Sequence, residues 1–232
     1  MCIRDRYGSL PALKARYDVV KRYPEIVGIS IGTRPDCIDD EVLDLINSYA
    51  GRYEVWMEYG LQSIHKETLN FINRGHCYED FLKAVKLTRK KKNINICAHV
   101  IIGLPHKWGG RETREMIMAT AREMGRLELD GIKIHPLHIV KGTKLETIFL
   151  KGGYPPMDLE EYVELAAEFL EYLSPRTVIQ RISAECPREW LVAPQWISDK
   201  QKVLRIIEEK MIHKGVSQGI KHGDSRENRN EQ

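Results

Sequence analysis

The sequence predicts an α/β fold in which parallel strands alternate with helices. Short apolar runs rich in β-branched residues recur along the chain, stretches with helical spacing separate them, and runs such as Val100-Ile101-Ile102 are apolar without a break. Strands separated by helices need right-handed crossovers, which make the strands parallel. We therefore expect an α/β barrel or an open α/β sheet.

The individual elements follow from local signals. The expected strands, each bounded by Gly, Pro or polar residues, are 26–33, 54–58, 94–102, 131–140 and 177–182. The expected helices are 10–23, 40–49, 78–92, 111–126 and 159–173. In the second helix, Asp40 and Glu41 occupy the first turn, where carboxylates suit the helix dipole, and an apolar stripe follows.

Composition limits the class of protein. With 232 residues, of which 42% are apolar, one globular domain is expected, and 36 basic against 33 acidic residues leave a net charge of only +3. The five cysteines form no C-x-x-C pair and no secretory signal precedes them, so they indicate reduced thiols in the cytoplasm. No run approaches the roughly 18 apolar residues of a membrane span, so no membrane partner is expected.

Four regions are expected along the chain. Residues 1–9 lack any pattern and are interpreted as a non-native or disordered start, and residues 10–150 form a partial β/α barrel. Residues 151–214 form a small C-terminal extension that is mainly helical. Residues 215–232 are polar and aperiodic, which predicts a disordered tail.

Unusual residues gather directly after the expected strands, as in G-T-R-P-D from Gly32, E-Y-G-L-Q-S from Glu58, G-L-P from Gly103 and the segment 135–143. In parallel α/β proteins the active site lies at the C-terminal ends of the strands. Gly and Pro in one such loop are ordinary turn residues, but four loops together predict one shared site.

Taken in order, G-T-R-P-D, E-x-G-L-Q-S with N-R-G-H, H-V-I-I-G-L-P and H-I-V-K-G-T-K-L resemble the YhcC-like family of radical S-adenosylmethionine (SAM) proteins. More distantly, the chain is similar to the elongator catalytic subunit and to oxygen-independent coproporphyrinogen oxidase. The resemblance covers roughly residues 10–210. It implies a TIM-like barrel, here missing its first strands.

The resemblance also implies the chemistry. A [4Fe-4S] cluster and SAM would be the cofactors, and cleavage of SAM would give a 5′-deoxyadenosyl radical that abstracts hydrogen from an unknown substrate, an RNA or a small molecule. An electron donor such as flavodoxin or ferredoxin would be a partner. The family holds its cluster in a C-x-x-x-C-x-x-C loop, which this sequence lacks, so we expect the ligands upstream of residue 1 and an inactive chain.

Five residues match cofactor-binding positions of the family. Arg74 would meet the methionine carboxylate, Gln62 the ribose hydroxyls, and Ile101 and Gly103 would flank the adenine. His99 stands where relatives carry an aspartate toward the ribose. Four of the five have a structural alternative: a solvated arginine, a turn-capping amide, a core isoleucine and a hydrogen-bonded barrel histidine.

Several further residues have interpretations of their own. Gly32 replaces the glutamate of relatives and leaves room for substrate, and Arg34 either meets an anionic substrate or pairs with Asp36. His135 and His138 are three apart on a strand and make a poor chelating pair. No catalytic residue is assigned, and no metal ligand is expected within the chain.

Two rival functions remain open. The first is a non-catalytic nucleotide- or RNA-binding domain, suggested by the basic run Arg89-Lys90-Lys91-Lys92, which equally suits a solvated helix end. The second is a metal-dependent hydrolase using His99, His135 and His138.

Overall fold

The computed structural model describes residues 9–223, and the first eight residues and residues 224–232 lie outside it. Its main sheet consists of five parallel strands in the order β1-β2-β3-β6-β8, which are Gly28–Thr33, Glu54–Gln62, Ile94–Ile102, Gly131–Pro136 and Val178–Arg181. Two small antiparallel pairs accompany it, β4 (Pro105–Lys107) with β5 (Gly110–Arg111) and β7 (Ile139–Val140) with β9 (Leu191–Ala193). The parallel α/β architecture is therefore confirmed.

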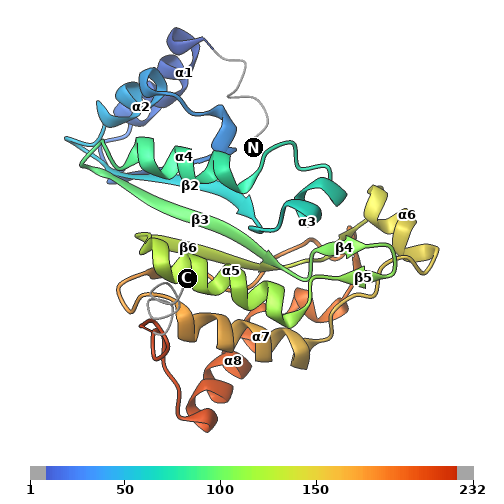
Figure 1. The fold of residues 1–232 in the computed structure, drawn as a ribbon. Coiled ribbons are helices and arrows are strands. Elements are labelled where there is room, and N and C mark those ends of the chain that lie inside the picture. Colours follow the sequence, from blue (N-terminus) through green and yellow to red (C-terminus); the bar gives the residue numbers. More distant parts are fainter. Residues whose placement is uncertain (1–8, 224–232) are drawn as a thin grey trace, which may run out of the picture.

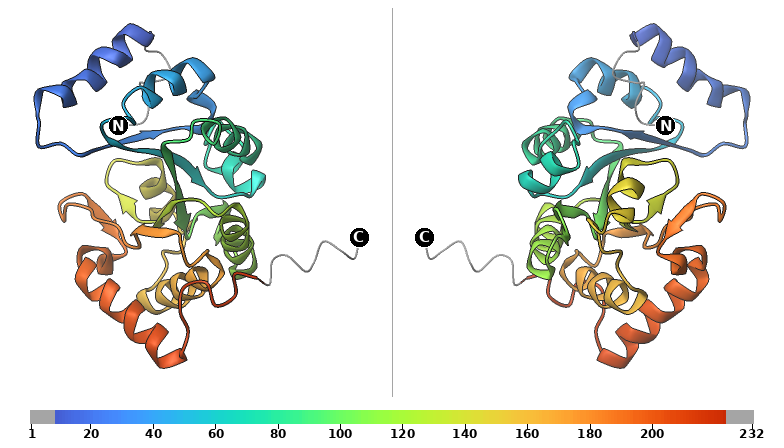
Figure 2. Two further views of the ribbon diagram at one scale, coloured as in Figure 1. Left: turned by 90° about the vertical axis from the view of Figure 1, so that its left-hand side faces the viewer. Right: turned by 90° about the vertical axis from the view of Figure 1, so that its right-hand side faces the viewer.

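The α-helices, in chain order α1 to α8, are Leu10–Tyr17, Asp40–Asn47, Lys66–Phe71, Tyr78–Thr88, Arg114–Leu127, Lys144–Leu150, Leu159–Tyr172 and Lys200–Lys214. Short 3-10 turns cover Asp18–Arg22, Pro35–Cys37 and Gln195–Ser198. Seen along the strands, α2, α4, α5 and α7 form an arc outside the curved sheet (Figure 2).

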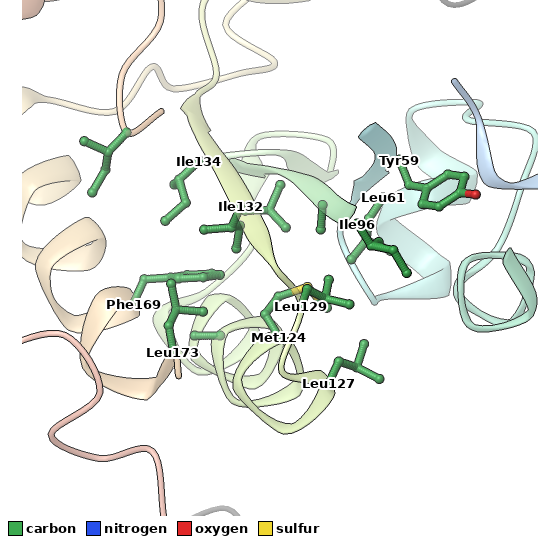
Figure 3. Close-up of a cluster of buried hydrophobic side chains, with 14 of the residues drawn as sticks. Tyr59, Leu61, Ile96, Met124, Leu127, Leu129, Ile132, Ile134, Phe169 and Leu173 are labelled. Atoms are coloured by element: carbon green, nitrogen blue, oxygen red, sulfur yellow. The ribbon is translucent and has the colours of Figure 1, made fainter. Parts of the chain in front are cut away.

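The core lies between the sheet and this arc of helices. Leu61, Ile96 and Ile132 project from the strands, and Met124 of α5 and Phe169 of α7 pack against that face (Figure 3). All five side chains are buried. Alternate strand residues thus face the helices, while their neighbours line the opposite, concave face of the sheet.

Helix starts follow the local sequence. Asp39, Thr113 and Asp158 precede α2, α5 and α7, and each side chain accepts a hydrogen bond from a first-turn backbone N–H. The expectation of a helix from residue 111 is wrong at its start, because Arg111 belongs to β5 and the cap at Thr113 begins α5. Strand β2 extends to Gln62, beyond the expected end at residue 58.

The C-terminal region adds more than helices. Strand β8 of the expected extension joins β6 at the edge of the main sheet. The expected disordered tail is wrong for residues 215–223, which fold back onto the end of α7 (Figure 1). There Gly219 N–H and Lys221 N–H donate to Leu170 O and Glu171 O at 3.1 and 2.8 Å. These hydrogen bonds help to offset the conformational entropy that the segment loses on ordering, and the polar composition of the segment did not reveal them.

Candidate functional site

The candidate site lies where β2, β3 and β6 reach their C-terminal ends, near the hairpin β4–β5 and α6 (Figure 1). Gln62 is the last residue of β2, and Gly103 directly follows β3. Arg74 lies in the loop between α3 and α4. Because neighbouring parallel strands end at the same edge, these residues from distant parts of the sequence share one region.

Gln62 and Arg74 converge over Gly60. A Cβ atom on Gly60 would lie 2.5 Å from Arg74 Nη2 and 2.7 Å from Gln62 Nε2, so a larger residue here would push the ends of both side chains out of these positions. Arg74 Nη2 also donates to Gly60 O at 3.0 Å. The structure therefore brings together two residues that the sequence placed at one cofactor.

The backbone of Gln62 is strained. Its φ is +72°, in the left-handed region, and the pairing with β3 is irregular between Gly60 and Gln62. The next residue, Ser63, is buried and donates to Glu112 Oε1 at 2.5 Å. Burial raises the pKa of the Glu112 carboxyl. This buried pair anchors the turn at Gln62 to the segment that follows β5.

Gly103 and Ile101 continue the site on β3. Gly103 has a φ of +95°, which an L side chain rarely adopts, and its carbonyl accepts a 2.7 Å hydrogen bond from Tyr154 Oη. Ile101 is half-buried and lies in register with His135 of β6. The glycine is buried and supplies the turn after β3, and the half-buried isoleucine supplies apolar surface beside it.

His99 is held by an acid that sequence analysis did not single out. Its Nε2 lies 3.0 Å from Glu58 Oε2 on β2, and Lys133 Nζ on β6 lies 2.5 Å from Glu58 Oε1. Hydrogen bonding from His99, followed by that from Lys133, lowers the pKa of Glu58 to about 2. With one ring nitrogen occupied by Glu58, His99 has only Nδ1 left for a ligand.

His135 stacks on His99 with ring centroids 5.6 Å apart. Burial, and then the charges of His99, Arg181 and Lys133, lower the pKa of His135 to about 4, so its ring is neutral at pH 7. Its Nε2 is buried without a hydrogen-bond partner in the described part of the chain. This nitrogen faces the concave side of the sheet, where a ligand atom or a water could satisfy it.

Arg34 has a structural role. Arg34 forms two hydrogen bonds with Asp36, at 2.8 and 2.7 Å, and a third with Gly75 O, so the structural pair is the one observed. The part of the chain that the structure describes contains neither a cluster of metal ligands nor a helix that could span a membrane. Among residues 9–223, no group of three or more His, Cys, Asp or Glu side chains could hold a metal ion. Within the same residues, no helix has the length and apolar character to cross a membrane.

A groove of about 960 Å³ lies away from this site, between α5, α7 and residues 214–221. Five acidic side chains line it. Four are paired with a base, Glu161 with Arg111, Glu164 with Lys214, Glu168 with Arg114 and Glu171 with Lys221, and the fifth, Glu112, accepts a hydrogen bond from Ser63. Because each of these paired acids already has a basic partner, we interpret the groove as a contact between structural elements and not as a ligand site.

Sequence reasoning missed Glu58, Lys133 and Glu112. Glu58 and Lys133 stand alone among apolar strand residues, and that isolation was the available signal, since charges inside buried strands need partners. Their pairing joins β2 to β6 across β3. No local spacing reveals such a contact.

A parallel α/β sheet with polar side chains and strained turns at its C-terminal edge is typical of proteins of the β/α-barrel class. The model of the Radical SAM superfamily matches residues 4–124, and that of the Radical_SAM C-terminal domain matches residues 129–213. The chain belongs to the radical SAM superfamily.

Individual relatives and a solved structure are similar to this chain over most of its length. The chain is 41% identical over 217 residues to an uncharacterized protein of Methanocaldococcus jannaschii, covering 93% of this chain and 66% of that protein. It is 36% identical to protein YhcC of Escherichia coli K12, covering 84% and 61%. The fold is similar to archaeal Elp3 of Methanocaldococcus infernus, with a TM-score of 0.69 at 24% identity, over 83% of this chain and 43% of that one. The chain thus spans about two thirds or less of the length of these relatives.

Proposed function

We propose that the concave face of the sheet binds SAM, with Arg74 at the methionine carboxylate, Gln62 and His99 toward the ribose, and Ile101 and Gly103 at the adenine. The observation that carries the proposal is that Gln62 and Arg74 converge over Gly60. A ligand with both a diol and a carboxylate needs an amide and a guanidinium close together. When bound to a [4Fe-4S] cluster, SAM supplies a 5′-deoxyadenosyl radical that abstracts hydrogen from a substrate.

The residues of this chain fit SAM but not the cluster. Its described cysteines, Cys37, Cys77, Cys97 and Cys186, belong to no group that could hold a metal. Cys97 is buried, and burial raises the pKa of its thiol to about 12, which disfavours the thiolate that binds iron. We propose that the chain by itself is inactive. We also propose that the complete site receives electrons from a donor protein and that it works in the reducing cytoplasm.

Arg74→Ala tests the assignment in a version of the protein that carries a C-x-x-x-C-x-x-C loop. Removing a charged hydrogen-bond donor from a carboxylate should weaken SAM binding by roughly 1.5–3 kcal/mol, measured anaerobically by equilibrium dialysis. Arg205→Ala is the matched control, because Arg205 is exposed on α8, where it pairs with Glu209, and its loss should leave SAM affinity unchanged. Unchanged affinity in folded Arg74→Ala would reject the assignment.

A further inference from the structure

A continuous rim borders the site at the C-terminal ends of the strands. We define it as residues 105–111, 139–153 and 187–191, which contain the β4–β5 hairpin, β7, α6 and the turn before β9. Lys141 N–H donates to Trp190 O at 2.8 Å, and Gly109 N–H donates to Gly153 O at 2.9 Å, so the three segments are joined by backbone hydrogen bonds. Figure 1 shows α6 standing out beside β4 and β5 at this end.

The rim exposes two tryptophans. Trp108 is 59% exposed and Trp190 is 57% exposed, although tryptophan is a residue that folding normally covers. The ring of Trp108 rests on Gly153, where a Cβ would lie only 2.6 Å from the ring. The glycine therefore seats the indole against the backbone and leaves its other surface open.

The rim also carries unpaired positive charge. Lys107, Lys141, Lys144, Lys151 and Arg188 are exposed, and none has an ion pair with any residue that the structure describes. The acids of the rim are Glu146, which accepts a hydrogen bond from Gly142 N–H at 2.7 Å, and Glu189. Positive charge therefore exceeds negative charge along the rim.

The basic run at the end of α4 differs from the rim. Lys91 pairs with Asp44 at 2.5 Å and also with Asp40, and Arg89 donates to Leu127 O. These side chains tie α4 to its neighbours. The nucleic-acid hypothesis built on Arg89–Lys92 thus loses two of its four cations to structural contacts.

We propose that the rim binds single-stranded nucleic acid, its lysines meeting the phosphates and its two tryptophans stacking on bases. Aromatic platforms among unpaired cations are the chemistry that single strands require, since every base has a π-face and every phosphate a charge. An anionic membrane fits less well, because the exposed lysines Lys107 and Lys151 directly adjoin the exposed apolar residues Trp108 and Leu150 in the sequence. The proposal does not depend on SAM binding.

Fluorescence anisotropy with labelled single-stranded RNA and DNA of one sequence, about 20 nucleotides long, tests the rim on the purified chain. Lys141→Glu/Lys144→Glu/Lys151→Glu should weaken binding at least about tenfold and reduce the slope of log affinity against log salt by about 2, at about 0.7 per lost phosphate contact. Trp108→Ala/Trp190→Ala should also weaken binding about tenfold, but with an unchanged salt slope.

The matched control is Lys83→Glu/Lys86→Glu/Lys90→Glu, which makes the same change of net charge on exposed lysines in and just after α4. It should retain most of the parent affinity, and circular dichroism should show that all variants are folded. Equal losses in both triple variants would overturn the proposal in favour of a diffuse charge effect. Absence of binding to either strand, or binding only to anionic vesicles, would also overturn it, and comparison of RNA with DNA identifies the preferred strand.

Discussion

The two faces of the main sheet are built from the same five strands and serve different ends. On β3, Ile96 and Val100 face the helices and are buried, whereas His99 and Ile101 face the concave side and stay half-exposed. The helix-facing side is mainly apolar, and the concave side carries the acid, the imidazoles and the lysine of the site. Stability and chemistry are thus separated by the two-residue period of the strand.

The largest expected effect is on the free energy of unfolding, and it is found by comparing one isoleucine from each face of the sheet. Ile96→Ala should lower the free energy of unfolding by about 2–5 kcal/mol, because it leaves a cavity in a packed core. Ile101→Ala, on the same strand but half-buried, should cost roughly 1 kcal/mol, since less apolar surface is lost. Urea denaturation of both variants measures the difference. Equal losses would show that the concave face is also part of the core.

A smaller effect tests the charges of the concave face. Lys133→Met should cost about 1–3 kcal/mol at pH 7, because Glu58 keeps only His99 as a partner. The Glu58 pKa of about 2 lies below its ordinary value of 4.5, so its contribution is present above pH 4.5 and lost as pH falls toward 2.

Urea midpoints between pH 7 and pH 2 should therefore fall less steeply for Lys133→Met than for the parent. Lys90→Met, at an exposed and unpaired lysine, should change stability by less than about 0.5 kcal/mol. Parallel pH curves for the parent and Lys133→Met would contradict the ion pair.

The smallest effect concerns backbone strain at the site. Gln62→Gly should stabilise the chain by up to about 1 kcal/mol, because glycine adopts the +72° φ without penalty. The same change should weaken SAM binding. Asn73→Gly, at a φ of +53° that asparagine tolerates, should change stability less. A destabilised Gln62→Gly protein would mean that the glutamine side chain holds the turn.

The sequence predicted those features that repeat locally. Strand β3 was predicted to the residue, at 94–102, because a long apolar run is bounded by polar residues on one side and by Gly-Leu-Pro on the other. Strand β2 was cut short because Gly60 was taken as a turn, whereas its missing side chain makes room for Arg74 and Gln62. Short elements such as α3 and α6 carry too few periods to be visible.

The site was predicted in part. Ordered motifs led to Gln62, Arg74 and Gly103, which the structure places at one end of the sheet. Their assignment to SAM stays a prediction. Glu58 and Lys133 were out of reach, because their partners become neighbours only when the sheet forms. The exposed tryptophans of the rim were likewise unrecognisable before burial was known.

The return of residues 215–223 has a consequence for how the chain is made. Gln218 Nε2 donates to Ser174 O at 2.7 Å and to Thr177 O at 2.8 Å, and His222 reaches Glu128 beside the end of α5. Ribosomal synthesis proceeds from the N-terminus, so these contacts form only after residues 215–223 have been translated. The end of α7 and the start of β8 therefore gain these hydrogen bonds only once this segment has been made.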